Sequence, residues 1–369
     1  MVILSYHNIR VPFPSAHSLL TMQTSMDLSA LAEVYFYANS GSREIGFKEV
    51  YGAGPDECPS LHLRLTRFSQ KGMASVEKRA RVIKDIISLR QEKIFVYVTQ
   101  AKPLRFFLWL KKLGFRIKII VEPHSETEAW DSESLGNVDG IIYTTESLRN
   151  RLVRAFSIPA DIPARVFYHR IRGPLPEAMP QGRPLEKTIT LGYIGGLEAW
   201  KGVDTIIEAL RFLPENIRVK FIGGEPGGPD HKRMQALAGG TGVSDRLSFT
   251  GRVPQQALSS EAEGVDIFIL PLLDSAQGSL PLKLFDYMQF GKPIIASDQD
   301  SVKEVLDVDS ALFFSSGSDK SLADQVSRLL TERSLGPRLA AKAFSELKKY
   351  AVDKWLINMN DFLETIVVK

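Results

Sequence analysis

The chain has 369 residues, which is long enough for two domains that each bury a full core. Its hydrophobic content of 44%, charged content of 24% and net charge of +3 are ordinary for a soluble globular enzyme. The apolar runs are too short to span a bilayer, the start lacks a secretory signal, and the single cysteine, Cys58, excludes an intrachain disulfide. No Cys/His cluster has the spacing of a zinc site. We therefore expect a cytoplasmic protein in a reducing compartment.

The charge is unevenly distributed. Residues 64–118 hold fifteen Lys and Arg against three acidic residues, a local balance of +12 in a chain whose net charge is +3. This basic region includes the segment KPLRFFLWLKKLGFRIK, which mixes basic and aromatic residues as a membrane-binding surface does. A set of solvated helix faces would give the same composition, so both interpretations stay open.

The first half alternates short apolar segments with longer amphipathic ones. Strands are expected at Val2–Tyr6, Glu33–Tyr37, Ile94–Thr99, Ile117–Glu122 and Gly140–Thr144, and helices at a segment through Met22 and Met26, Val76–Leu89, Leu104–Leu113 and Ser147–Ala155. This alternation predicts βαβ units around a parallel sheet. We assign residues 1–172 to this first domain.

Residues 173–184 contain four prolines and predict an interdomain linker over 173–186. The alternation then restarts in a second domain, 187–345, with strands TITLGYI, RVKFIGG, RLSFTG, VDIFILPL and KPIIASD and helices between them. This pattern predicts a doubly wound parallel sheet with a ligand at the carboxyl ends of its strands. Residues 346–369 form an amphipathic helix, which we expect to pack back on the first domain.

Two strand-to-helix junctions of the second domain each place a lysine near the start of a helix. Lys201 follows the Gly195-Gly196 turn, and Lys283 lies in or just after the first turn of a helix expected to begin near Ser279. A cation is disfavoured there by the helix dipole unless an anion lies between them. Surface lysines explain either junction alone, but two at one sheet edge favour a diphosphate ligand.

Asp286 refines this ligand. It lies seven residues after Ser279, about 10 Å along a continuous helix, and on the same side as Lys283. A carboxylate at that position suits the two hydroxyl groups of a ribose. The alternative is an ordinary i, i+3 ion pair between Asp286 and Lys283.

These segments together resemble the retaining GT-B glycosyltransferases of family 4 (glycosyl transferases group 1). The matching pieces, IGGLEAWKGVDTIIEAL, FIGG, LSFTGRVPQQAL, VDIFILPL and LPLKLFDYMQFGKPIIASD, stand in the family's order between about residues 188 and 310. The resemblance implies an α/β protein with the GT-B fold, in which two Rossmann-like doubly wound parallel-sheet domains face each other across a cleft.

The resemblance also implies roles for single residues. Lys201 would contact the donor diphosphate as a catalytic residue, and the remaining donor site would consist of Gly195, Gly196, Arg252, Val253, Ser279, Leu280, Lys283 and Asp286. Within this set Asp286 would hold the ribose, and main-chain groups around Arg252 and Val253 would face the nucleobase. In the first domain, IKIIVEPHSE resembles the family's E-x-H region, so His124 would be catalytic beside the transferred sugar. A hydrogen-bonded loop histidine is the alternative. The loop with Ser15 and His17 would face donor and acceptor.

The chain departs from the family at three places. Gly278 stands where the family has the first of two glutamates, and Asp286 replaces the second. Gly196-Leu197 stands where the family often has an arginine, and the first loop lacks its frequent glycines. Two D-x-D pairs, Asp298–Asp300 and Asp307–Asp309, are similar to metal-binding pairs, but we interpret both as ordinary turns.

The resemblance implies a metal-independent hexosyltransferase that needs no cofactor. It would move a sugar from a nucleotide-diphosphate donor, UDP- or GDP-linked, to a glycan or lipid-linked acceptor in cell-envelope or exopolysaccharide synthesis. The basic region 64–118 would contact an anionic membrane surface from the cytoplasmic side, and no nucleic acid is expected as a partner. Two alternatives are a catalytically silent relative that binds nucleotides in a glycan-assembly complex and a nucleotide-sugar epimerase.

Overall fold

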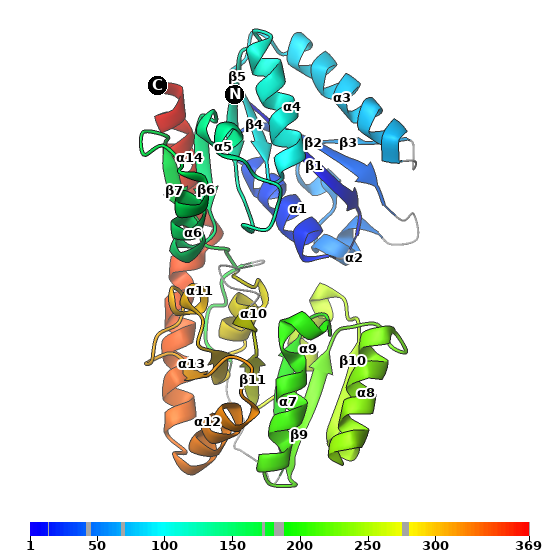
Figure 1. Ribbon diagram of the computed structural model, residues 1–369, viewed down its shortest axis with the longest axis vertical. Helices are drawn as coiled ribbons and strands as arrows, with labels where there is room; N and C mark the ends of the chain where they lie inside the picture. Colours follow the sequence, from blue (N-terminus) through cyan, green and yellow to red (C-terminus); the bar gives the residue numbers. More distant parts are fainter. Residues whose placement is uncertain are drawn as a thin grey trace. The chain divides into compact units, whose positions relative to one another are not determined.

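The computed structural model covers residues 1–369 and describes 1–13, 15–41, 46–67, 71–171, 174–180, 188–274 and 280–368. Its contacts divide the chain into two compact units (Figure 1). The first unit is Met1–Tyr168 with Val352–Lys369, and the second is His169–Ala351. The predicted linker 173–186 falls largely outside the described residues and stays a prediction.

The first unit is built on a seven-stranded, fully parallel sheet in the order β3-β2-β1-β4-β5-β6-β7. Its strands are β1 (Val2–Val11), β2 (Glu33–Ser40), β3 (Leu61–Leu65), β4 (Ile94–Val98), β5 (Ile117–Val121), β6 (Gly140–Tyr143) and β7 (Ala164–Val166). Its helices are α1 (Ala16–Leu28), α2 (Phe47–Tyr51), α3 (Lys71–Ser88), α4 (Ala101–Lys112), α5 (Ser132–Gly136), α6 (Glu146–Phe156) and α14 (Val352–Val368).

Helices cover both faces of this sheet, which explains why β4 reads IFVYV and is buried throughout. On one face α3, α4, α5 and α6 pack against alternate strand residues such as Val96 and Ile119. On the other face α1, α2 and α14 pack against the intervening residues, such as Phe95 and Ile120. The strand alternation of side chains therefore separates two cores.

The second unit is built on a six-stranded parallel sheet in the order β10-β9-β8-β11-β12-β13. Its strands are β8 (Ile189–Ile194), β9 (Ile217–Ile222), β10 (Leu247–Gly251), β11 (Ile267–Leu270), β12 (Ile294–Ser297) and β13 (Leu312–Phe314). Its helices are α7 (Val203–Ala209), α8 (Pro229–Thr241), α9 (Leu258–Glu263), α10 (Lys283–Gln289), α11 (Asp300–Lys303), α12 (Asp319–Thr331) and α13 (Leu335–Glu346). The predicted doubly wound architecture is confirmed in both units.

Each sheet reverses its strand order at one point, between β1 and β4 in the first unit and between β8 and β11 in the second. In open parallel sheets of this kind, ligands bind outside the carboxyl ends of the strands at this switch point. Each unit therefore has one edge where functional side chains are expected.

Several predicted elements differ from the observed ones. The strands β3, β7 and β13 were not expected, and β1 extends to Val11 with a register shift against β2 between Tyr6 and Arg10. The predicted helix start near Ser279 is wrong, because α10 begins at Lys283, directly after Leu282. Leu280 precedes Pro281, and a residue before proline is biased away from helical backbone angles.

No helix within the described part of the chain is long and apolar enough to cross a bilayer.

The last helix, α14, completes the core of the first unit. Trp355 and Phe362 are buried and contact the ring of Phe167 with centroid separations of 6.0 and 5.9 Å.

We expect Phe362→Ala to lower the free energy of unfolding by about 3–5 kcal/mol, because the cavity adds to the lost apolar burial. Chemical denaturation measures this change. Ile357→Ala on the exposed side of the same helix is the control and should change it by about 0.5 kcal/mol or less; equal losses would contradict the packing.

Candidate functional site

In the second unit, the switch point is formed by the turn that follows β8. The strand ends at Ile194, Gly195 has a φ of 139°, and Gly196 leads into a short 3-10 helix, Ala199–Lys201, before α7. Only glycine adopts the backbone angles of Gly195 readily. The chain therefore turns sharply at the edge where a ligand is expected.

The structure brings both predicted lysines to this turn. A Cβ atom added to Gly195 would lie 2.9 Å from Nζ of Lys283, and one added to Gly196 would lie 2.6 Å from Nζ of Lys201. The two ammonium groups therefore approach adjacent residues of one turn, although the lysines come from segments more than eighty residues apart. Any side chain at either glycine would displace them.

Lys283 is held by a tyrosine beneath the turn. Its Nζ donates a hydrogen bond of 2.7 Å to the Tyr193 hydroxyl and lies 3.9 Å from the centroid of the same ring. The Tyr193 hydroxyl in turn donates to the carbonyl oxygen of Gly196 over 2.9 Å. Burial and the neighbouring Lys201 charge lower the pKa of Lys283 well below its ordinary value, while Glu198 and Asp286 act in the opposite direction.

Lys201 is paired with a carboxylate of the same turn. Its Nζ lies 2.7 Å from Oε2 of Glu198, a side chain that is 45% exposed. Burial is the largest single influence and raises the pKa of Glu198, but the interaction with Lys201, a hydrogen bond to the backbone of Glu198 and the charge of Lys283 together hold this pKa below its usual value. Glu198 is therefore ionised at neutral pH and would compete with an anionic ligand for Lys201.

The other predicted donor-site residues lie on neighbouring strand ends or helices. Asp286 is buried on α10, three residues after Lys283, and Leu280 is buried just before this helix. Arg252 is exposed and Val253 half-buried in the loop that follows β10. Ser279 and Gly278 lie outside the described residues.

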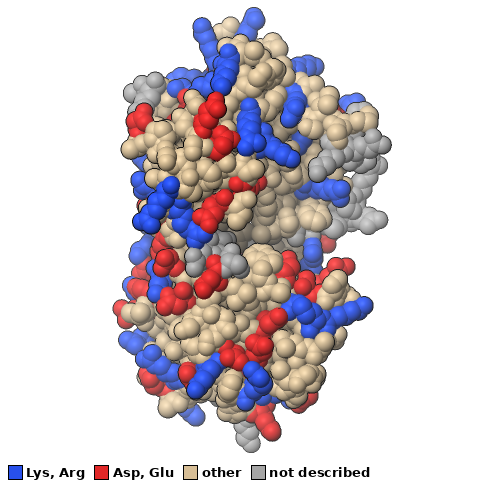
Figure 2. All heavy atoms as spheres, in the orientation of Figure 1, with Lys and Arg blue, Asp and Glu red and all other residues tan. Residues whose placement is uncertain are grey.

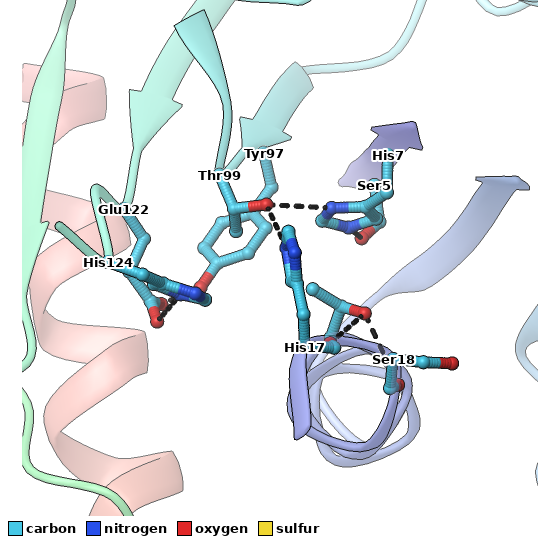
Figure 3. A network of polar contacts seen from close by, with 9 residues as sticks. Ser5, His7, His17, Ser18, Tyr97, Thr99, Glu122 and His124 are labelled. Atoms are coloured by element: carbon cyan, nitrogen blue, oxygen red, sulfur yellow. Dashed lines mark hydrogen bonds and ion pairs between the residues drawn. The ribbon is translucent and has the colours of Figure 1, made fainter. Parts of the chain in front are cut away.

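In the first unit, the switch point holds a network of polar side chains (Figure 3). Nδ1 of the buried His7 lies 3.1 Å from the Thr99 hydroxyl oxygen, which also lies 3.0 Å from Nε2 of His17. His7 follows the last regular pair of β1 with β2, Thr99 follows β4, and His17 lies in the first turn of α1. Three elements therefore deliver side chains to one edge of the sheet.

The predicted residue His124 adjoins this network. Its Nε2 lies 2.8 Å from Oε1 of Glu122, whose other oxygen accepts a short hydrogen bond from the Tyr97 hydroxyl. The rings of His17 and His124 meet edge to face with centroids 5.3 Å apart. The two histidines expected near the substrates are thus neighbours, and Glu122 fixes the orientation of one of them.

Burial keeps the imidazoles of this network neutral. It is the main cause that lowers the pKa of His7 well below its ordinary value, with charges on His17, His124 and Lys78 adding to it. Burial, followed by repulsion from His124, lowers the pKa of His17 to about 4. At neutral pH His7 and His17 are hydrogen-bonding groups rather than cations.

A buried lysine supports the end of β1. Nζ of Lys78 donates to the carbonyl oxygen of His7 over 2.9 Å and to the Asn8 side chain over 2.8 Å. Burial is the main cause that lowers the pKa of Lys78 to about 8, and repulsion from Arg79 is the second. Lys78 thus satisfies a strand carbonyl at the register shift and fixes the position of His7.

Sequence reasoning missed the partners that orient these sites. Tyr193 and Glu198 act on the lysines, while Ser5, His7, Tyr97, Thr99 and Glu122 complete the histidine network. The sequence could have indicated part of this network, because Ser5 and His7 are polar residues within the apolar first strand. Ser15, by contrast, caps α1 by accepting a hydrogen bond from the Ser18 amide.

Within the described residues, no three His, Cys, Asp or Glu side chains are grouped as a bound metal ion would require.

Comparison with known proteins identifies one family model that matches within the second unit and several relatives that match larger parts of the chain. Residues 176–346 match the family Glycosyl transferases group 1. A D-inositol 3-phosphate glycosyltransferase of Xylanimonas cellulosilytica is 27% identical over 60% of this chain and 56% of its own length. A GDP-mannose-dependent alpha-(1-6)-phosphatidylinositol monomannoside mannosyltransferase of Mycobacterium tuberculosis is 24% identical over 64% of this chain and 67% of its own. The matches span little more than half the length of several such relatives.

Solved structures resemble the whole chain. Sucrose-phosphate synthase from Thermosynechococcus elongatus superposes with a TM-score of 0.77 at 14% identity, covering 100% of this chain and 98% of the other. Anabaena Alr3699/HepE in complex with UDP gives a TM-score of 0.74 at 14% identity, covering 99% of both chains. Together with the two Rossmann-like sheets, these similarities show that the chain has the GT-B fold.

The lowered pKa of His17 predicts a pH dependence of stability. An unfolded histidine takes up a proton near pH 6.5 but folded His17 only near pH 4, so its contribution is complete above pH 6.5 and is lost as the pH falls toward 4. We expect the fall in the free energy of unfolding between pH 7 and pH 4.5 to be smaller in His17→Gln than in the wild type, by up to about 2 kcal/mol. Urea denaturation at both pH values measures it, with His62→Gln as the control. An equal fall in wild type and His17→Gln would contradict it.

Proposed function

We propose that this protein is a retaining glycosyltransferase that moves a hexose from a nucleotide-diphosphate donor to a glycan or lipid-linked acceptor. The observation that carries the proposal is the convergence of Lys201 and Lys283 on the Gly195–Gly196 turn. Two ammonium groups at the switch point of a parallel sheet suit a diphosphate. The match of residues 176–346 to Glycosyl transferases group 1 supports the same reading.

The lysines would act on the leaving group. When the bond between the anomeric carbon and the donor phosphate breaks, negative charge grows on the diphosphate, and fixed cations in a partly buried site stabilise it without reorganisation. Lys201 and Lys283 would supply this charge in place of a metal ion. Tyr193 orients Lys283 through its hydroxyl and its ring, so it acts through the lysine.

The remaining donor-site assignments follow from the family resemblance and from position. Asp286, buried one turn after Lys283, would accept hydrogen bonds from the ribose hydroxyls. Main-chain groups of Gly195, Gly196, Leu280 and Ser279 would contact the phosphates, and those of Arg252 and Val253 the nucleobase. His124 would line the site of the transferred sugar in the first unit. A UDP- or GDP-linked donor is proposed, in line with a UDP complex among the similar structures and GDP-mannose in the name of one relative.

The acceptor and location are proposed by analogy. Relatives include an O-antigen chain mannosyltransferase and the phosphatidylinositol monomannoside enzyme, both named for envelope or lipid-linked products. We propose a cytoplasmic enzyme at the membrane in cell-envelope or exopolysaccharide synthesis. Because the curated relatives are named as glycosyltransferases, an enzyme is favoured over a silent nucleotide-binding partner.

A surface of the first unit suits the membrane part of this proposal. Along α3 the exposed residues Met73, Val76 and Ile87 recur at helical spacing. Trp109 on α4 of the same sheet face and Leu113, which directly follows α4, are also exposed. Figure 2 shows Lys and Arg side chains gathered at the end of the view where Figure 1 places α3 and α4. Apolar and aromatic side chains bordered by cations are typical of a surface that binds anionic lipid headgroups.

The basic region is more neutralised than its composition indicates. Among the described residues of this region, six cations form ion pairs, several of them with acidic residues outside the region: Arg64, Arg81, Arg105, Lys111, Lys112 and Lys118. Their partners include Asp131, Glu133 and Asp139, which follow in the sequence. The exposed apolar residues of α3 and α4 therefore carry more of the membrane proposal than the net charge does.

Turnover of a nucleotide sugar tests the function. We expect release of the nucleoside diphosphate from one member of a panel of UDP-, GDP- and ADP-sugars in the presence of glycan and lipid acceptors.

Lys201→Ala should weaken binding of that nucleoside diphosphate by about tenfold to a hundredfold, because charge-assisted hydrogen bonds are lost, and leave binding of the bare nucleoside unaffected. Isothermal titration calorimetry measures both ligands. Lys220→Ala, on β9 and paired with Glu261, is the control. Binding without turnover of any sugar, or equal losses for nucleoside and diphosphate, would contradict the proposal.

Removal of the competing carboxylate should have the opposite effect. Glu198 forms an ion pair with Lys201, so a diphosphate bound to Lys201 would compete with this carboxylate. We expect Glu198→Gln to bind the nucleoside diphosphate several-fold more tightly than the wild type. The same titration tests this, and weaker binding would show that Glu198 orients Lys201 rather than competing with the ligand.

Vesicle binding tests the membrane surface. The protein should sediment with vesicles rich in phosphatidylglycerol and much less with phosphatidylcholine alone. Val76→Asp should reduce this binding several-fold, because it places a negative charge within the apolar stripe. Val308→Asp, at a valine of the second unit that is 76% exposed compared with 68% for Val76, is the matched control. Equal binding by both variants would contradict this surface.

A further inference from the structure

The histidine network of the first unit contains a chain of hydrogen bonds whose direction can be worked out. It links α1, β1 and the end of β4 through the side chains of Ser25, Ser5, His7, Thr99 and His17. Figure 3 shows Ser5, His7, Thr99 and His17 of this chain. Four of these residues are buried, and His17 is partly exposed at the end of the chain. The proton positions along it decide what His17 offers to a ligand.

The direction is set at the buried end. The Ser25 hydroxyl donates its only proton to the carbonyl oxygen of Thr21 over 2.9 Å. The hydrogen bond of 2.8 Å between Ser25 and Ser5 must therefore use the proton of Ser5. Since Ser5 has no second proton, the 2.8 Å contact to Nε2 of His7 requires that nitrogen to donate.

The same reasoning extends through His7. Its burial favours the neutral ring, which carries one proton, so with Nε2 protonated its Nδ1 accepts. The Thr99 hydroxyl, 3.1 Å away, is the donor to that Nδ1. Its single proton is then used, and Nε2 of His17 at 3.0 Å must donate to the Thr99 oxygen.

His17 is thereby held in one tautomer. Its proton is on Nε2, and Nδ1 keeps a lone pair that no described residue engages by a hydrogen bond. Its position in the first turn of α1, at the positive end of the helix dipole, and the adjacent His124 ring both disfavour a second proton. The carboxylate of Glu122 would favour a second proton on His17, but both of its oxygens already form hydrogen bonds, one with His124 and one with Tyr97.

We propose that His17 is a specificity-determining residue that accepts a hydrogen bond from a hydroxyl group of a neutral sugar through Nδ1. A lone pair on a neutral ring attracts O–H donors and repels phosphate or carboxylate oxygens. The first unit thus selects an uncharged, hydroxyl-bearing group, whereas the lysines of the second unit select an anion. The sugar identity rests on the proposed glycosyltransferase function, while the tautomer does not.

The tautomer is tested by nitrogen NMR of protein labelled with 15N-histidine, with single histidine variants for assignment. At pH 7 the His17 signals should show a protonated Nε2 and an unprotonated Nδ1. Thr99→Ser should keep this pattern, and Thr99→Val should lose it, because only the serine hydroxyl still accepts from Nε2. A proton on Nδ1 of wild-type His17, or on both nitrogens, would overturn the inference.

The ligand class is tested on the same protein with methyl glucoside, methyl mannoside, methyl galactoside and inorganic phosphate. We expect one glycoside to shift the Nδ1 resonance of His17 and phosphate to leave it unchanged. His17→Ala should weaken binding of that glycoside about three- to tenfold, and His62→Ala should not. A shift by phosphate, or none by any glycoside at high millimolar concentration, would overturn the inference. Nucleoside diphosphate release from the same preparation shows separately whether the proposed function holds.

Discussion

The feature on which the second unit depends is the approach of two like charges to one glycine turn. Lys201 and Lys283 raise each other's electrostatic energy, and burial adds to this for Lys283. The fold tolerates the pair because Glu198 neutralises one lysine and the hydroxyl and ring of Tyr193 hold the other. The balance at Lys201 comes from a carboxylate that is 45% exposed, so the anion proposed for this site would compete with a side chain that solvent also reaches.

The two units use one topology for opposite chemistry. Both sheets have the same strand order around a switch point, so both collect side chains at the carboxyl ends of two central strands. In the second unit that edge holds the ammonium groups of the two lysines and a turn formed by two glycines, Gly195 and Gly196. In the first it holds neutral imidazoles linked to buried hydroxyls. The edge of the second unit therefore suits an anionic group, and the edge of the first unit suits a neutral group that bears hydroxyls.

The sequence predicted those parts of the structure that follow from strand periodicity and strand ends. The apolar run of β4 and the Gly195-Gly196 turn were readable because burial on both faces and sharp turns restrict residue type. Three-residue strands such as β7 and β13 carry too little pattern, and β3, LHLRL, mixes polar residues at the edge of the sheet. The start of α10 was placed too early, because the apolar stripe from Leu282 onward does not mark where the helix begins and Pro281 disfavours helical backbone angles at the residue before it.

The partners of the site residues could not be predicted, because they depend on side-chain direction. Nothing in the sequence links Tyr193 to Lys283, ninety residues apart, or Thr99 to both His7 and His17. Yet these partners and the burial of each site decide the chemistry. Burial favours the neutral form of His17, which can accept a hydrogen bond, and burial at the other site destabilises the charge on Lys283. A neutral sugar would leave the histidine uncharged, whereas an anion would stabilise the charged form of Lys283. Burial thus favours the uncharged form of the histidine, and it makes the charged form of Lys283 more dependent on a negative partner.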